Sequence, residues 1–348
     1  GCTFCGECMQ GCRVGAKNTL MKNYLWFAEK RGATIHPERQ VIDVEPLGAA
    51  DGSDGYRVVT KRPGTWLYTE QREFRARGIV FAAGALGTNR LLGSCKLNGS
   101  LPHLSDKLGS LVRTNSESVL AVTLPKGTEK LWNDVMISSS IHPRPDTHIE
   151  FVTYGRNGDS MSFLYTMLTG KGTRLTRPLK WLGSIVKHPV TFLKTLWPFG
   201  WSERSLSFLV MQTLDNAIAF RTRRGWFGGI RFTTEQDPEK PNPTFIEVAN
   251  EAAEVFARET GGYAQSMILE ALGNVPTTAH ILGGAVVADS PERGVVDRNS
   301  RVFGYRNMLI CDGSTIPANP GVNPSLTITA MSENAMAAIP EAKPGWWQ

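Results

Sequence analysis

Two stretches near opposite ends of the chain have the same form, a buried strand that runs into a glycine turn. Residues 78–84 read Gly-Ile-Val-Phe-Ala-Ala-Gly, and residues 307–313 read Asn-Met-Leu-Ile-Cys-Asp-Gly. A short apolar run that ends in glycine and precedes a helix is typical of a nucleotide-binding α/β fold. Helices are predicted after these strands, at residues 88–92 and 326–338. We therefore expect both ends of the chain to contribute to such a fold.

The middle of the chain has a different pattern. Between residues 116 and 234, extended segments alternate with polar turns, as in an antiparallel sheet with one covered face. These segments are residues 119–123, 135–141, 161–167, 205–212 and 230–233. Further elements are predicted as helices at 20–30 and 245–259 and as short strands at 34–36, 41–45 and 56–60. The predicted domains are 1–115 and 276–340, which flank an inserted domain at 116–275, with a tail at 341–348.

Charge and composition exclude some classes of protein. The net charge of +6 is mild and spread along all 348 residues, without a basic block, which argues against a nucleic-acid partner. No apolar run reaches the ~18 residues that a membrane span needs. The chain begins with Gly1 rather than Met and opens directly into a cysteine cluster. We expect it to be a partial chain, whose targeting signals would lie upstream.

Three short motifs lie in the last eighty residues. His280 stands just before the glycine pair Gly283-Gly284, Asp312-Gly313 ends a predicted buried strand, and Asn323-Pro324 precedes a predicted helix. Proline suits the first position of a helix and asparagine suits its cap. A helix that begins there directs its positive end outward, toward a negatively charged ligand. Each motif by itself also fits a capped helix or a core histidine.

Taken together, these motifs resemble the C-terminal signature of the glucose–methanol–choline (GMC) oxidoreductases. The run Gly-Ala-Leu-Gly-Thr-Asn-Arg-Leu-Leu from Gly84 resembles a second signature of that family. Segments at 15–25, 113–117, 202–203 and 215–216 are similar to the cholesterol oxidases of the actinobacterial, mycobacterial type within it. The resemblance extends to about residue 339. The family's N-terminal G-x-G-x-x-G segment does not occur in this sequence, so the resemblance implies an N-terminally truncated member.

The resemblance implies a fold, a cofactor and a set of site residues. The fold is a GMC-type FAD-binding domain, incomplete here, with a β-sheet substrate-binding domain inserted. His280 and Asn323 match the pair that faces the flavin and holds the substrate hydroxyl. Glu203 matches the carboxylate that moves a proton during steroid isomerisation. The positions that match cofactor contacts are Val41, Gly84, Asp312, Gly313, Asn323 and Pro324.

These residue types suit the implied chemistry. Oxidation of a secondary alcohol removes a proton from oxygen and delivers a hydride to the flavin, and a histidine can take or orient that proton near neutral pH. Shifting a double bond from the 5-ene to the 4-ene position needs one carboxylate, and a glutamate in an apolar pocket has a suitably raised pKa. The expected substrate is the 3β-hydroxyl of cholesterol or a similar bulky alcohol, with O2 or a downstream acceptor taking the electrons. Glu203 could equally be a surface salt-bridge residue.

Four cysteines within the first twelve residues follow the spacing Cys2-x-x-Cys5-x-x-Cys8-x-x-x-Cys12. This is the spacing of a bacterial ferredoxin run, although Arg13 stands where proline usually follows. The spacing predicts a 4Fe–4S cluster, with zinc or no metal as alternatives. The isolated Cys95 and Cys311 do not form a disulfide framework with them. This placement of the cysteines favours a cytoplasmic or membrane-associated protein over a disulfide-rich secreted one.

Two further features have open interpretations. His142, Asp146 and His148 are three metal-ligand types, but their spacing fits no common site and suits a structural loop. Residues 179–201 carry Lys180, Lys187 and Lys194 among apolar and aromatic residues. This stretch could touch a membrane surface transiently to admit a sterol, or it could be a lid packed over the substrate cavity.

Two rival functions remain open at this point. One is a GMC alcohol or sugar dehydrogenase that passes its electrons through an iron–sulfur cluster rather than to O2. The other is a flavin-binding or iron–sulfur electron-transfer protein without catalysis of its own. The pairing of His280 with Asn323 within family motifs argues against the second.

Overall fold

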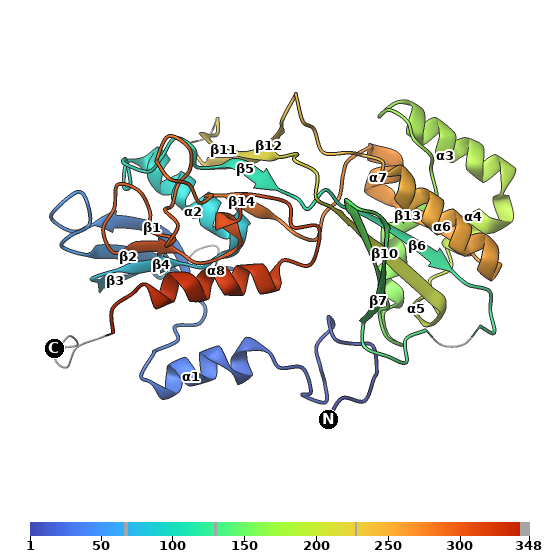
Figure 1. The fold of residues 1–348 in the computed structure, drawn as a ribbon, viewed down its shortest axis with the longest axis horizontal. Coiled ribbons are helices and arrows are strands. Elements are labelled where there is room, and N and C mark those ends of the chain that lie inside the picture. The colour runs from blue at the N-terminus through green and yellow to red at the C-terminus, as the bar shows by residue number, and fades with distance from the viewer. Residues whose placement is uncertain (66–68, 129–130, 227, 342–348) are drawn as a thin grey trace. The chain divides into compact units, whose positions relative to one another are not determined.

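The computed structural model describes residues 1–65, 69–128, 131–226 and 228–341. Its backbone divides into two compact units (Figure 1). Unit 1 comprises residues 1–35, 116–213 and 243–279, and Unit 2 comprises residues 36–115, 214–242 and 280 onward. The boundary at residue 116 coincides with the predicted one. Two segments differ from the predicted division: residues 1–35 lie in Unit 1 and residues 214–242 lie in Unit 2. The predicted tail, from residue 342 on, lies outside the described residues.

Unit 1 is built on a six-stranded antiparallel sheet with the strand order β7-β8-β10-β6-β13-β9. Its strands are β6 (Ser118–Thr123), β7 (Ile137–Arg144), β8 (Thr147–Val152), β9 (Tyr165–Met167), β10 (Ser205–Gln212) and β13 (Tyr263–Met267). The predicted antiparallel sheet is therefore present in the middle of the chain. Residues 161–164 belong to a 3₁₀ helix rather than to a strand.

Alternation along the strands gives this sheet two different faces. On the first face, Phe208 and Val210 of β10 and Ile149 of β8 pack with helix α6 (Glu247–Thr260) in one apolar cluster. On the second face, Leu209 and Met211 of β10 lie in another cluster, which also contains Val152, Tyr154, Tyr165 and Trp201. Side chains on β8 that alternate with Ile149 therefore belong to the second face.

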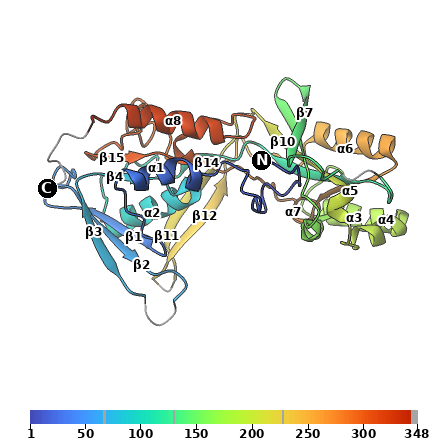
Figure 2. The ribbon, with the colours of Figure 1, turned by 90° about the horizontal axis from the view of Figure 1, so that it is seen from below.

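The other helices of Unit 1 are short. They are α1 (Tyr24–Lys30), α3 (Thr176–Lys187), α4 (Pro189–Thr195), α5 (Trp201–Arg204) and α7 (Ile268–Gly273), with 3₁₀ helices at Leu20–Lys22 and Asp159–Leu164. Helices α3 and α4 lie side by side as a hairpin (Figure 2). Pro189 separates them, because it lacks a backbone N–H and occupies the first position of α4.

Unit 2 contains three sheets. The first is the antiparallel sheet β1 (Gln40–Pro46), β2 (Tyr56–Lys61) and β3 (Arg72–Ala76). The second has the order β12-β11-β5-β14, from Ile230–Gln236, Ile218–Arg224, Ser110–Arg113 and Leu282–Gly284. The third is the pair β4 (Ile79–Phe81) and β15 (Met308–Ile310). Its helices are α2 (Gly84–Asn98), the 3₁₀ helix η3 (Gly313–Thr315) and α8 (Ser325–Ala337).

The pair β4 and β15 is parallel, with Ile79 opposite Met308 and Phe81 opposite Ile310. Phe81, Met308 and Ile310 lie in the main core of Unit 2, together with Leu92 of α2 and Tyr56 of β2. Both glycine-ended strands predicted from the sequence are thus present, and the structure pairs them in parallel. Helix α2 is longer than the predicted 88–92 because it begins at Gly84 and runs until Gly99 caps it in the left-handed conformation.

Two other predicted strands have a different outcome. Residues 34–36 are not in a strand. Residues 230–233 do form a strand, β12, but it pairs with β11, which in turn pairs with β5 of Unit 2. A short alternating run shows that one face is covered and does not show which sheet covers it.

Gly283 provides a test of the packing in Unit 2. Its φ is +72°, and a Cβ there would lie 2.1 Å from the carbonyl oxygen of Leu111. Gly99 has a φ of +85° and nothing within 4 Å of a Cβ. Alanine at Gly99 costs only the left-handed conformation, about 1 kcal/mol. Alanine at Gly283 must also displace a strand, which adds roughly 1–3 kcal/mol. We expect the Gly283→Ala protein to have the lower midpoint of thermal unfolding, and equal midpoints would contradict this packing.

Candidate active site

The carboxylate of Asp312 joins the turn after β15 to the start of α2. Its Oδ2 accepts hydrogen bonds from the Gly84 backbone N–H at 3.0 Å and from the Thr88 hydroxyl at 2.5 Å. Its Oδ1 accepts from the backbone N–H and the hydroxyl of Ser314, at 2.8 and 2.5 Å. Asp312 is buried, so these four bonds offset the cost of removing its charge from water. They also fix Gly84 and Gly313 relative to each other.

Gly84 begins α2 at a place where the backbone is accessible. Its φ is +72°, and no atom lies within 4 Å of the position that a Cβ would take. The first turn of α2 has no acidic residue. The N-terminus of a helix carries a partial positive charge and free N–H groups, which favour a negatively charged ligand. This cradle therefore fits a phosphate or another anionic part of a cofactor.

Gly313 lies where β14 meets α8. A Cβ on Gly313 would stand 3.2 Å from Leu282 of β14 and 3.3 Å from Ile328 of α8. His280 is two residues before Leu282, and Asn323 is next to Pro324, the N-cap of α8. The two predicted catalytic residues thus come from segments that both contact Gly313. The convergence of their side chains on one cavity stays a prediction.

A buried polar network holds the loop that carries Asn323. The side chain of Asn115 accepts from the N–H of Gly321 at 2.8 Å and donates to the carbonyl of Val322 at 3.0 Å. Asn319 accepts from the N–H of Asn115 at 2.9 Å. Arg113 donates to the carbonyl of Pro317 at 2.8 Å. Because both edges of the Asn115 amide are used, the loop is fixed at the two residues just before Asn323.

Sequence reasoning did not assign this network. The segment that contains Arg113 and Asn115 was noted only for its resemblance to a family. Asn115 and Ser116 both have positive φ, at +58° and +47°, which is uncommon outside glycine. In the sequence, the only signal for this loop was the polar run from Arg113 to Ser116.

Val41 stands apart from these residues within Unit 2. It lies on β1 opposite Thr60, just before an irregularity in the strand pairing at Asp43. Its side chain is half-buried and packs on the main core of Unit 2. A contact of its backbone with a cofactor stays a prediction.

Glu203 lies at one end of the Unit 1 sheet. It belongs to α5, directly before β10, and Ser205 at the start of β10 pairs with Thr123. Its partly exposed carboxylate is 3.4 Å from the guanidinium of Arg156. The opposite end of β6, at Ser118, pairs with Val210. At about 3.4 Å per residue the two ends are roughly 17 Å apart.

Among the described glutamates of Unit 1, three are buried, unlike Glu203: Glu117, Glu150 and Glu270. Glu117 accepts from the Thr278 hydroxyl at 2.9 Å and from the Ala279 N–H at 2.5 Å, next to His280 in the chain. Glu270 accepts from the hydroxyls of Thr277 and Ser118, and burial raises the pKa of its carboxyl. Both therefore lie at the Ser118 end of the sheet, away from Glu203.

Glu150 belongs to the second face of the sheet. It alternates with Ile149 on β8 and pairs with Leu209 of β10. The Nδ1 of His148 is 4.0 Å from its Oε1 and has no hydrogen-bond partner in the described structure. The ring of His142 stacks on His148 with centroids 4.3 Å apart. A buried carboxylate thus stands beside an imidazole on a largely apolar face.

These positions bear on two predictions from the sequence. His142 and His148 do not form a metal-ligand group with Asp146, because no group of three ligand residues that could hold a metal occurs among the described residues. Glu203 forms an ion pair with Arg156, and its role in proton transfer stays a prediction. The signal for Glu150 in the sequence was its alternation with apolar residues on a strand.

The four N-terminal cysteines do not form a metal site, since the described residues include no such ligand group. Cys8 packs partly against the apolar cluster of the second sheet face. The thiol of Cys12 instead accepts from the N–H groups of Ala16 and Lys17 at 3.2 and 3.3 Å. The thiols thus serve different local contacts, and the structure does not support the iron–sulfur cluster expected from their spacing.

Contacts with the loop after β8 hold this segment in place. Gln10 donates to the carbonyl of Tyr154 at 2.7 Å, and Asn157 donates to Glu7 at 2.8 Å. A Cβ on Gly6 would lie 2.6 Å from the carbonyl oxygen of Trp132. The N-terminal segment therefore packs against the loop after β8, and Gly6 allows its backbone to approach Trp132 closely.

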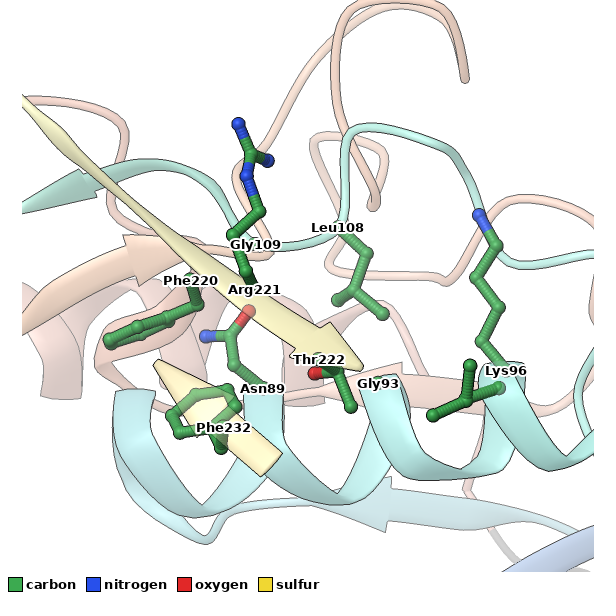
Figure 3. A pocket seen from close by; sticks show the side chains of 10 residues that line it. Asn89, Gly93, Lys96, Leu108, Gly109, Phe220, Arg221, Thr222 and Phe232 are labelled. Carbon is green, nitrogen blue, oxygen red and sulfur yellow. The ribbon is translucent and has the colours of Figure 1, made fainter. Parts of the chain in front are cut away.

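A pocket of about 440 Å³ lies elsewhere in Unit 2, between α2 and the hairpin of β11 and β12 (Figure 3). Asn89, Gly93 and Lys96 of α2 and Phe220 and Phe232 of the strands line it. None of the predicted site residues is among the lining residues. Asn89 also donates to the carbonyl of Gly283 at 3.1 Å, so one side of the pocket supports β14.

The cysteines differ in their expected reactivity, which gives a second test. The N–H of Lys17 above all lowers the pKa of the Cys12 thiol, whereas burial raises the pKa of Cys95 to about 12. A larger thiolate fraction at neutral pH makes Cys12 the better nucleophile. We expect iodoacetamide to modify Cys12 much faster than Cys95 in the native protein, as measured by peptide mass spectrometry over time. Modification of Cys95 at a similar rate would contradict its burial.

Comparison with known proteins places these features in a family. The GMC oxidoreductase C-terminal family model matches residues 228–332. The chain is 46% identical over 340 residues to a cholesterol oxidase of Acinetobacter baumannii, covering 97% of this chain and 61% of that protein. It is 45% identical over 347 residues to a cholesterol oxidase of Mycobacterium tuberculosis, covering 98% of this chain and 59% of that protein. The chain thus spans about 60% of the length of these relatives.

A solved structure supports the same fold. Pyridoxine 4-oxidase from Mesorbium loti superposes with a TM-score of 0.59 at 14% identity, covering 94% of this chain and 62% of that one. The expected GMC-type fold is confirmed by this likeness and by the family match. From the motifs, the fold and the identity over nearly its whole length, we conclude that this chain belongs to the GMC oxidoreductases.

Proposed function

We propose that the protein containing this chain is an FAD-dependent oxidase of secondary alcohols, with the 3β-hydroxyl of a sterol as its substrate. The observation that carries this proposal is the identity of 45–46% with cholesterol oxidases across both units. The match includes the Unit 2 residues around Gly84 and Asp312 and also the sheet of Unit 1. Similarity in Unit 2 supports a shared cofactor, and similarity in Unit 1 supports a shared class of substrate.

The residues of Unit 2 fit FAD, the cofactor of the GMC oxidoreductases. Gly84 would receive an anionic part of it at the start of α2, where the space around the glycine is open. Gly313 and the start of α8 at Pro324 supply a second helix end with a partial positive charge. When bound, FAD accepts the hydride from the alcohol carbon.

His280 and Asn323 have complementary roles in this proposal. His280 takes the proton from the substrate hydroxyl, because imidazole exchanges protons near neutral pH. The amide of Asn323 holds the hydroxyl oxygen without adding charge. The Asn115 network supports this role, since it fixes the two residues that precede Asn323. In the overall reaction the alcohol loses two hydrogens and O2 gains them as hydrogen peroxide.

Isomerisation of the steroid double bond would need a carboxylate that faces an apolar cavity. Glu150 is more deeply buried than Glu203, on the second face of the sheet beside Leu209. Glu203 is partly exposed and pairs with Arg156. We therefore assign the proton transfer to Glu150, whose Oε1 lies 4.0 Å from the Nδ1 of His148.

The role of His280 can be tested with a matched histidine. His280→Ala should lower alcohol oxidation by at least about a hundredfold, because a group that takes the proton is lost. His103→Ala, at an exposed histidine whose ring is tilted against that of Tyr305, should leave the rate unchanged. The rate is measured as peroxide formed from a sterol, and the flavin absorption spectrum checks that the cofactor is still bound. A near-normal rate in His280→Ala with bound flavin would contradict the role, and turnover with dyes but without peroxide would contradict an oxidase.

The two glutamates can be separated by their products. Glu150→Gln should oxidise a 5-ene sterol but accumulate the unconjugated ketone, because an amide cannot accept the proton. Glu203→Gln should still make the conjugated ketone at the normal rate. The ultraviolet absorption of the conjugated ketone distinguishes the two products. If Glu203→Gln alone stopped isomerisation, the assignment from the sequence would hold and the one to Glu150 would fail.

A further inference from the structure

Each helix of the hairpin α3–α4 exposes a row of apolar residues. Val186 is 82% exposed and Leu179 is 67% exposed, and they lie with Leu182 on one side of α3, at spacings of three and four residues. Val190 and Leu193 of α4 and Trp197 just beyond it have the same spacing and are also exposed. We call these six residues the hairpin face.

The opposite side of the hairpin is firmly attached to Unit 1. The indole N–H of Trp181 donates to the hydroxyl of Thr166 on β9 at 2.8 Å. The ring of Trp181 meets that of Phe192 edge-on, with centroids 5.8 Å apart, which joins α3 to α4. Arg177 is buried and donates to the carbonyl of Thr244. The hairpin therefore has its own buried side, and the hairpin face is a second apolar side left over.

Charge around this face has a single sign. From residue 171 to residue 202 the sequence contains six lysines and arginines and no aspartate or glutamate. Lys180 and Lys187 are exposed on α3, and Lys194 is exposed on α4. Each is one residue away in sequence from a member of the hairpin face. An apolar stripe bordered by lysines is the pattern of a helix that lies in a membrane interface.

We propose that the hairpin face docks the protein on a lipid bilayer that contains anionic phospholipids. The leucines and valines enter the boundary between headgroups and acyl chains, Trp197 lies at the headgroup level, and the three lysines contact lipid phosphates. No helix in the described part of the chain is long and apolar enough to cross a membrane. The contact is therefore one of adsorption to the surface.

The same charges argue against a second copy of this chain as the occupant. Two hairpin faces packed together would bring two sets of lysines close to one another, with no acidic residue in the segment to compensate. An anionic bilayer supplies the opposite charge along the whole border. The docking does not depend on the proposed reaction, because it requires neither sterol nor turnover.

Vesicle binding of the purified natural protein tests this inference. The probe is a set of sedimenting vesicles of phosphatidylcholine alone or with phosphatidylglycerol at three parts in ten. We expect binding to the mixed vesicles, weaker binding to phosphatidylcholine, and loss of binding at high salt. Val186→Glu should weaken binding to the mixed vesicles by at least about tenfold, because it places a charge within the apolar face. Lys180→Glu/Lys187→Glu should do so as well, since each lysine near the surface is worth about fivefold.

Val255→Glu is the matched control, because Val255 is an exposed valine on α6, outside the hairpin. It should bind vesicles as the natural protein does, and circular dichroism should show that all variants are folded. Equal binding by Val186→Glu and Val255→Glu would overturn the inference, as would failure of the natural protein to bind mixed vesicles. A change of oligomeric state in Val186→Glu, with vesicle binding retained, would identify a second copy as the occupant and would also overturn it.

Discussion

The hydrogen bonds of one buried carboxylate organise the part of Unit 2 that would hold a cofactor. Asp312 ends the strand pair of β4 and β15, and its two oxygens accept from Gly84, Thr88 and Ser314. A charge in this position is tolerated only because four donors converge on it. The same bonds set the start of α2 and the turn at Gly313, against which β14 and α8 pack. The N-terminal ends of α2 and α8, which could face an anionic ligand, thus both depend on the side chain of Asp312.

Two buried asparagine amides fix the loop before Asn323 in a similar way. Asn115 and Asn319 satisfy the backbone of the loop that leads to Asn323, so that this loop needs no regular secondary structure to be fixed. Catalytic side chains on loops require such support, because a displacement of about 1 Å can remove much of their effect. If Asn323 has the proposed role, these amides would position it without touching the substrate.

Unit 1 shows how one sheet can have two uses. Its first face is closed by α6 and forms an ordinary apolar core. Its second face combines aromatic and aliphatic residues with the buried Glu150 and His148. The hairpin of α3 and α4 adds an apolar surface with a basic border at the edge strand β9. These are the features of Unit 1 on which the proposed sterol substrate and the proposed membrane contact rest.

Much of the fold followed from local patterns in the sequence. The two glycine-ended strands, the antiparallel sheet between them and the helices α6 and α8 were predicted because periodicity and glycine turns report local geometry. The parallel pairing of the two strands is known only from the structure. The family followed from short sequence motifs. The roles of His280, Asn323 and Gly84 were inferred from the same motifs and stay predictions. The division of the chain did not follow, because residues 1–35 and 214–242 are assigned by long-range packing and strand pairing.

The difference between Glu203 and Glu150 has the same cause. The resemblance implied Glu203 as the proton-moving carboxylate, a role that stays a prediction, and only the antiparallel register shows that it lies at the end of the sheet opposite Ser118. The ferredoxin-like spacing of Cys2, Cys5, Cys8 and Cys12 likewise gave their positions in the sequence. It did not show whether their thiols point toward one another. The sequence by itself determined which types of residue and element are present in this protein. Only the tertiary structure decided which of them share a face, because burial and hydrogen bonding depend on partners far away in the chain.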